Sequence, residues 1–93
     1  MQECIKFIVK GKVQGVFYRK FVSIAMNKKR VIGFIKNLND GSVEVLIKAK
    51  KGSDISEILN ILNEGSPKSE VESILMQECN ERVDFSDKFE IRY

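Results

Sequence analysis

The sequence has no histidine and no tryptophan, and only two cysteines and one proline among its 93 residues. Without histidine, the chain cannot build a catalytic triad around an imidazole base. Its cysteines, Cys4 and Cys79, lie far apart and form no CxxC motif, so a zinc site is excluded as well. We expect both thiols to be reduced and partly buried.

Long apolar runs are also missing, as is a strong charge of one sign. The N-terminal segment carries charges at Glu3, Lys6 and Lys10, which is incompatible with a signal-peptide core or a membrane span. The net charge of +3 is too small to indicate nucleic-acid binding by itself. We therefore expect a cytoplasmic protein, a monomer that binds neither nucleic acid nor membranes.

What remains is the composition of a small globular protein. Hydrophobic residues make up 43% of the chain and charged residues 31%, far from a disordered composition. The length falls below that of one typical domain, and the sequence shows neither an internal repeat nor a low-complexity tract. Residues 1–93 are predicted to form a single domain with one modest core.

Hydrophobic periodicity predicts two helices and five strands. Apolar residues at helical spacing indicate helices from Arg19 to Lys29 and from Ile55 to about Glu64. Ser53 or Asp54 caps the second helix, and Gly65 ends it. Alternating patterns indicate the strands, which are expected at Ile5–Lys10, Ile32–Leu38, Ser42–Ala49, Glu70–Met76 and Lys88–Tyr93.

The order of these elements predicts the fold. Asp40-Gly41 between two β-rich runs is a strong hairpin signal, so the second and third strands are adjacent. The order βαββαβ, followed by a short final strand, is typical of an α+β ferredoxin-like sandwich. We expect an antiparallel sheet with both helices on one face. Because this fold serves binding modules and enzymes alike, function must be inferred from the site.

The segment from Gly11 to Arg19 joins the first strand to the first helix and contains two glycines. Such a loop can turn successive backbone N–H groups toward an anion beside a helix N-terminus. A tight turn explains the glycines equally well. Arg19 favours the anion site, because a cation in the first turn of a helix opposes the helix dipole, whereas its planar guanidinium suits a phosphate group. A solvated surface arginine is the ordinary alternative.

Asn37 is the third candidate. Asparagine is depleted in strands, and the nearby turn already has Asn39, Asp40 and Gly41. The Asn37 amide both donates and accepts hydrogen bonds, so it is suited to holding a water molecule. A strand-end asparagine bonded to local backbone is the competing explanation.

Two motifs together resemble the signatures of the acylphosphatase family. They read Gly11-x-Val13-Gln14-Gly15-Val16-x-x-Arg19 and Gly33-Phe34-Ile35-x-Asn37-x-x-Asp40-Gly41-Ser42-Val43-Glu44. Gly65-Ser66-Pro67 and the final Phe85-x-x-x-Phe89-x-Ile91 are also similar to that family, so the resemblance extends from about residue 4 to the C-terminal end. Departures at Tyr18, Phe34 and residues 29–32 are conservative in packing and leave Arg19 and Asn37 in register.

The resemblance implies an acylphosphatase that hydrolyses acyl phosphates to a carboxylate and inorganic phosphate without a metal or cofactor. It places the phosphoryl group on the backbone N–H groups of Gly15, Val16, Phe17, Tyr18 and Arg19 and on the Arg19 guanidinium. Asn37 would orient the attacking water, and inorganic phosphate would be a competitive inhibitor. Tyr18 either shapes this site or only packs, and we favour packing.

Two other functions are compatible with this order of elements. An RNA-recognition module shares the element order but binds RNA through aromatic residues on its central strands, and here Ser42–Ala49 has none. A small-ligand regulatory domain of the same fold stays open, and lack of turnover with any acyl phosphate would favour it.

Overall fold

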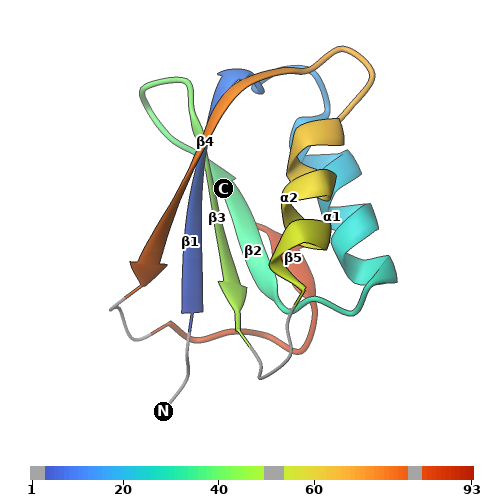
Figure 1. The fold of residues 1–93 in the computed structure, drawn as a ribbon, viewed down its shortest axis with the longest axis vertical. Helices are drawn as coiled ribbons and strands as arrows, with labels where there is room; N and C mark the ends of the chain where they lie inside the picture. The colour runs from blue at the N-terminus through green and yellow to red at the C-terminus, as the bar shows by residue number, and fades with distance from the viewer. Residues whose placement is uncertain (1–3, 50–53, 80–82) are drawn as a thin grey trace.

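The computed structural model describes residues 4–49, 54–79 and 83–93. The elements follow the predicted order, and their bounds are β1 Cys4–Lys12, α1 Tyr18–Lys28, β2 Gly33–Asn37, β3 Val43–Lys48, α2 Ile55–Glu64, β4 Glu70–Cys79 and β5 Phe89–Ile91. The strands form one sheet in the order β4-β1-β3-β2-β5, and both helices cover the same face of it (Figure 1). The ferredoxin-like α+β prediction is confirmed. Among the described residues, no helix is long and apolar enough to cross a membrane.

The core lies between this sheet and the helices. The residues of β1 and β3 that face the helices are fully buried, as the predicted alternation required. They are Phe7, Val9, Val43, Val45 and Ile47. The helices contribute a complementary apolar face, formed by Val22, Met26, Ile58 and Leu62. The helix-facing side of the central strands is therefore the side that anchors both helices.

The opposite face of the sheet is also partly covered, which the sequence did not predict. Phe34 and Leu46 lie directly across from each other on β2 and β3, and both are buried. The ring of Phe34 contacts the ring of Phe85, with centroids 6.4 Å apart, and the guanidinium of Arg92, whose Cζ lies 4.0 Å from the ring centroid. Residues near the C-terminal end therefore pack against the face that the helices leave open.

The two helices begin in different ways. The Asp54 carboxylate, one of the two predicted caps, accepts a hydrogen bond from the Glu57 N–H at 3.2 Å and caps α2. The other candidate, Ser53, lies outside the described residues. Helix α1 starts without a side-chain cap and without an acidic residue in its first turn. The positive end of α1 is thus left open, at the loop that the sequence indicated as an anion site.

The sheet is mixed, so the prediction of a wholly antiparallel sheet is wrong in one strand pair. β5 runs parallel to β2, with Gly33 opposite Phe89 and Ile35 opposite Ile91. Strand directions explain this result. β4 is antiparallel to β1 and ends beside Cys4, at the end of the sheet where β2 begins. A chain that starts from that end and joins the free edge of β2 must run in the same direction as β2.

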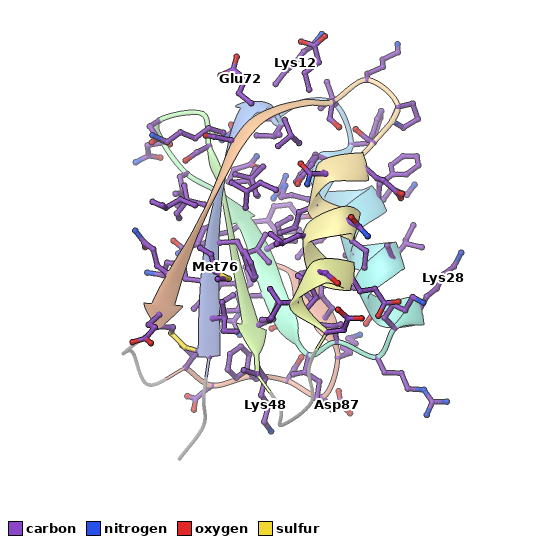
Figure 2. The ribbon with its side chains drawn as sticks, viewed as in Figure 1. Lys12, Lys28, Lys48, Glu72, Met76 and Asp87 are labelled. Atoms are coloured by element: carbon purple, nitrogen blue, oxygen red, sulfur yellow. A yellow bond between two sulfur atoms is a disulfide. The ribbon has the colours of Figure 1, made fainter. Side chains whose placement is uncertain are left out.

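The expectation of two reduced thiols is wrong in this structure, because Cys4 and Cys79 form a disulfide (Figure 2). They are direct partners in the pairing of β1 with β4, with Cα atoms 5.2 Å apart. That distance suits a disulfide. The two cysteines are 75 residues apart in the sequence, so their proximity could not be predicted from local patterns. It arises from the register in which the edge strand β4 pairs with β1.

Candidate functional site

The loop between β1 and α1, residues 13–17, has an unusual backbone. Gly15 and Phe17 both lie in the left-handed region, with φ of 74° and 62°. Glycine adopts this conformation freely, but a bulky residue such as phenylalanine rarely does. The Phe17 side chain is 72% exposed, so core packing does not account for its backbone conformation. Such conformations are concentrated at functional sites.

This loop presents a row of backbone donors. Within the described parts of the chain, no hydrogen bond engages the N–H groups of Gly15, Val16, Phe17, Tyr18 or Arg19. The first N–H in this region with an acceptor is that of Phe21, which donates to the Phe17 carbonyl at 3.1 Å. Free N–H groups at a helix N-terminus attract anions, and here no acidic side chain competes for them.

Arg19 lies in the first turn of α1 and is half-buried. Its Nη1 donates to the Arg92 carbonyl at 3.3 Å, and its Cζ lies 4.7 Å from the ring centroid of Tyr93. The interpretation of Arg19 as a purely solvated side chain is therefore wrong. Both contacts orient the guanidinium, and within residues 4–49, 54–79 and 83–93 no carboxylate pairs with it, so its charge stays available to an anion.

Asn37 ends β2, where its backbone pairs with Val43. Its side chain is exposed and makes no hydrogen bond within the described residues, so the local backbone contact that was the competing explanation is not observed there. The Arg92 N–H donates to the Ile35 carbonyl at 2.9 Å, which continues the β2–β5 pairing beyond the strand. Asn37 lies two residues beyond Ile35 on β2, and the Arg92 carbonyl beside Ile35 accepts the hydrogen bond from Arg19. Arg19 and Asn37 thus approach the same end of the sheet.

Gln14 connects the loop to the β2–β3 hairpin. Its Nε2 donates to the carbonyls of Leu38 and Ser42, at 2.9 and 2.8 Å. Leu38 follows Asn37 directly, so this contact fixes the loop relative to Asn37. The hairpin is held in turn by Asp40, whose carboxylate accepts from the Ser42 N–H and hydroxyl. These hydrogen bonds keep the pKa of Asp40 below its usual value.

Helix α2 supports the loop from the other side. The Tyr18 hydroxyl donates to the Leu62 carbonyl at 2.6 Å, and the Ser66 hydroxyl donates to the Val16 carbonyl at 2.6 Å. Tyr18 is 1% exposed, and burial raises the pKa of its hydroxyl above the usual range. The Tyr18 side chain therefore packs in the core and joins the start of α1 to α2. A Cβ on Gly65 would overlap the Tyr18 ring, which explains the glycine there.

The sequence did not predict the roles of four residues around this site. Gln14 and Ser66 are only parts of motifs in the sequence, and the contacts of Arg19 with Arg92 and Tyr93 were not expected. The signals were weak: a glutamine beside Gly15 and a serine before the single proline. Within the described residues, no group of three or more His, Cys, Asp or Glu side chains could hold a metal ion.

Comparison with known proteins gives a consistent result. Residues 5–91 match the family model described as acylphosphatase. An acylphosphatase of Bacillus licheniformis is 35% identical over 88 residues, covering 95% of this chain and 96% of the relative. One from Dehalococcoides mccartyi is 40% identical over 72 residues, covering 76% and 78%. The crystal structure of acylphosphatase from Bacillus subtilis superposes with a TM-score of 0.83 at 32% identity, covering 98% of this chain and 99% of that one. The chain therefore belongs to the acylphosphatase family of enzymes.

Proposed function

We propose that this protein hydrolyses acyl phosphates to a carboxylate and inorganic phosphate, with the phosphoryl group bound in the 13–17 loop and the first turn of α1. The observation that carries the proposal is the row of N–H groups from Gly15 to Arg19, which have no acceptor within the described residues, beside the Arg19 guanidinium. Several N–H donors and one bidentate cation match the oxygens of a phosphoryl group.

The residues assigned to the site suit the chemistry of this reaction. A carboxylate leaving group has a conjugate acid with a pKa of about 4, so it departs without a proton and needs no general acid. Positioning and charge stabilisation then dominate, as in phosphoryl transfer generally. In this proposal the N–H groups and Arg19 neutralise the charge of the phosphoryl oxygens, and the reaction requires no metal or cofactor.

Asn37 is assigned the role of orienting the attacking water. Its amide is exposed and has no other partner within the described residues, and it lies at the end of the sheet where Arg19 is held. An amide does not titrate, so it would act by hydrogen bonding and not as a general base. Water attack on the phosphorus atom would break the bond to the carboxylate oxygen, and the released phosphate would stay on the same donors until it dissociates.

The test compares two substrates under identical conditions. Phosphate release from benzoyl phosphate should be rapid, and p-nitrophenyl phosphate should be nearly untouched, because the site offers no acid to a poorer leaving group. Comparable rates on both would refute the proposal. No turnover of any acyl phosphate would favour the alternative of a small-ligand regulatory domain.

A further inference from the structure

The Val16 carbonyl is buried and accepts a hydrogen bond from the Ser66 hydroxyl at 2.6 Å. Val16 is 9% exposed and Ser66 4%. The contact joins residues 50 positions apart and links the 13–17 loop to the turn that follows α2. A buried carbonyl needs a hydrogen-bond partner, so Ser66 determines which way this carbonyl points.

The direction of that carbonyl also sets the direction of a donor in the site. The Val16–Phe17 peptide bond is planar and trans, so its C=O and N–H point in opposite directions. With the carbonyl directed inward at Ser66, the Phe17 N–H is directed away from the interior. This N–H is one of the donors that have no acceptor within the described residues.

Ser66 is itself held in place by a compact turn. Its N–H donates to the Ser69 hydroxyl oxygen at 3.0 Å, and the Ser69 hydroxyl donates to the Ser66 carbonyl at 2.8 Å. Gly65 begins this turn with φ of 51°, and its N–H donates to the Ile61 carbonyl at 3.0 Å. The Ser66 hydroxyl is therefore presented in a fixed position at the C-terminal end of α2.

We propose that Ser66 is a positioning residue of the phosphoryl site. Its hydroxyl fixes the Val16–Phe17 peptide in the orientation that points the Phe17 N–H at the phosphoryl group. The inference rests on the proposed function, because it assigns a purpose to a donor of that site. Without the hydroxyl, the Val16 carbonyl would lose its buried partner and turn toward water, which would rotate the Phe17 N–H out of the site.

The experiment follows the amide signals of ¹⁵N-labelled protein during titration with inorganic phosphate, in the wild type, Ser66→Ala and Ser66→Thr. In the wild type, the Phe17 amide should shift with bound phosphate. Ser66→Ala should bind phosphate about tenfold more weakly, the factor expected for losing one hydrogen bond to a charged group, and the Phe17 shift should shrink. Ser66→Thr keeps the hydroxyl and should retain most of the affinity. The kcat/KM for benzoyl phosphate should change in parallel with phosphate affinity, so it should be reduced in Ser66→Ala and largely retained in Ser66→Thr.

Ile58→Val serves as the control for a general loss of stability. Ile58 is a core residue of α2 that is 4% exposed, and shortening it lowers stability without changing the loop. It should lower the melting temperature and leave phosphate affinity unchanged. If Ser66→Ala fails to fold, Ser66→Cys replaces it, since a thiol of similar size is a weak donor and should weaken phosphate binding in the same direction.

The outcomes separate the two claims. If the amide signals of residues 15–19 in the wild type do not shift when phosphate is added, the proposed site is refuted, and the role of Ser66 with it. Amides that respond in the wild type, together with Ser66→Ala affinity and kcat/KM equal to wild type, would overturn the role of Ser66 alone. An equal loss of affinity in Ile58→Val would also overturn it, because the effect would then be one of stability.

Discussion

The guanidinium of Arg19 lies over the ring of Tyr93, with its Cζ 4.7 Å from the ring centroid, and its Nη1 donates to the carbonyl of the preceding residue, Arg92. A side chain in the first turn of α1 is thus oriented by residues that follow β5. The contact explains how a cation at the positive end of a helix is kept in a defined position. It also connects the proposed phosphoryl site to the parallel pairing of β5 with β2.

Removing the ring tests the value of this contact. Tyr93→Ala should lower kcat/KM for an acyl phosphate about two- to fivefold, because a cation–π contact at an exposed site contributes about 0.5–1 kcal/mol. Tyr93→Phe keeps the ring and should match the wild type. Steady-state kinetics on benzoyl phosphate measures both. Equal activity of the alanine variant would show that the Arg92 carbonyl alone positions Arg19.

Asn37→Ala should lower kcat by roughly 10² or more and change KM little, because a group that orients water acts mainly in the transition state. Phosphate affinity should survive the substitution. The measurement is steady-state kinetics together with phosphate binding, after circular dichroism has established that the variant is folded. Weakened phosphate binding with normal kcat would reverse the role assigned to Asn37.

The disulfide should affect stability and not turnover. Cys4 begins β1, whereas the 13–17 loop follows the other end of that strand, and Figure 2 shows the disulfide at the end of the sheet far from the loop. Reduction should lower the free energy of unfolding by about 2–4 kcal/mol and leave kcat within a few-fold.

Thermal unfolding and benzoyl phosphate kinetics, each with and without dithiothreitol, test this expectation. The double variant Cys4→Ser, Cys79→Ser is the control and should not respond to dithiothreitol. Loss of turnover on reduction of a protein that stays folded would contradict the separation of disulfide and site.

Tyr18 predicts how stability depends on alkaline pH. Burial raises its pKa in the folded protein above the unfolded value of 10.0, so folding favours the neutral hydroxyl. The contribution of Tyr18 to the free energy of unfolding is complete below pH 10 and is lost as the pH rises above 10, because the Tyr18 hydroxyl can then ionise in the unfolded chain. Urea unfolding from pH 9 to 11 should show a steeper loss of stability for the wild type than for Tyr18→Phe. Parallel slopes would contradict this assignment.

Local patterns predicted most of the fold. The Asp54 cap, the Gly65 terminus and the Asp40-Gly41 turn each depend on neighbours within a few residues, and each is found where expected. The features of Gly15 and Arg19 that led us to propose an anion site are also local, because they depend on the loop and the first turn of α1 alone.

The rest depends on contacts between distant parts of the chain, which periodicity does not record. The parallel pairing of β5, the disulfide and the contact of Ser66 with Val16 all follow from topology and register. Arg92 is 73 residues from Arg19, and nothing in the local sequence of either residue indicates the other. The sequence therefore indicated which residues we assign to the proposed site but not the contacts that hold them in place.

Inhibition by inorganic phosphate in the wild type and in Arg19→Lys tests the central claim most directly. Phosphate should compete with benzoyl phosphate, because both would bind the N–H groups of the 13–17 loop and the Arg19 guanidinium. Arg19→Lys keeps the charge but loses the bidentate geometry, so the inhibition constant for phosphate should rise and kcat/KM should fall together, each by tenfold or more. Noncompetitive inhibition, or an Arg19→Lys variant that behaves like the wild type, would contradict the placement of the phosphoryl group in this loop.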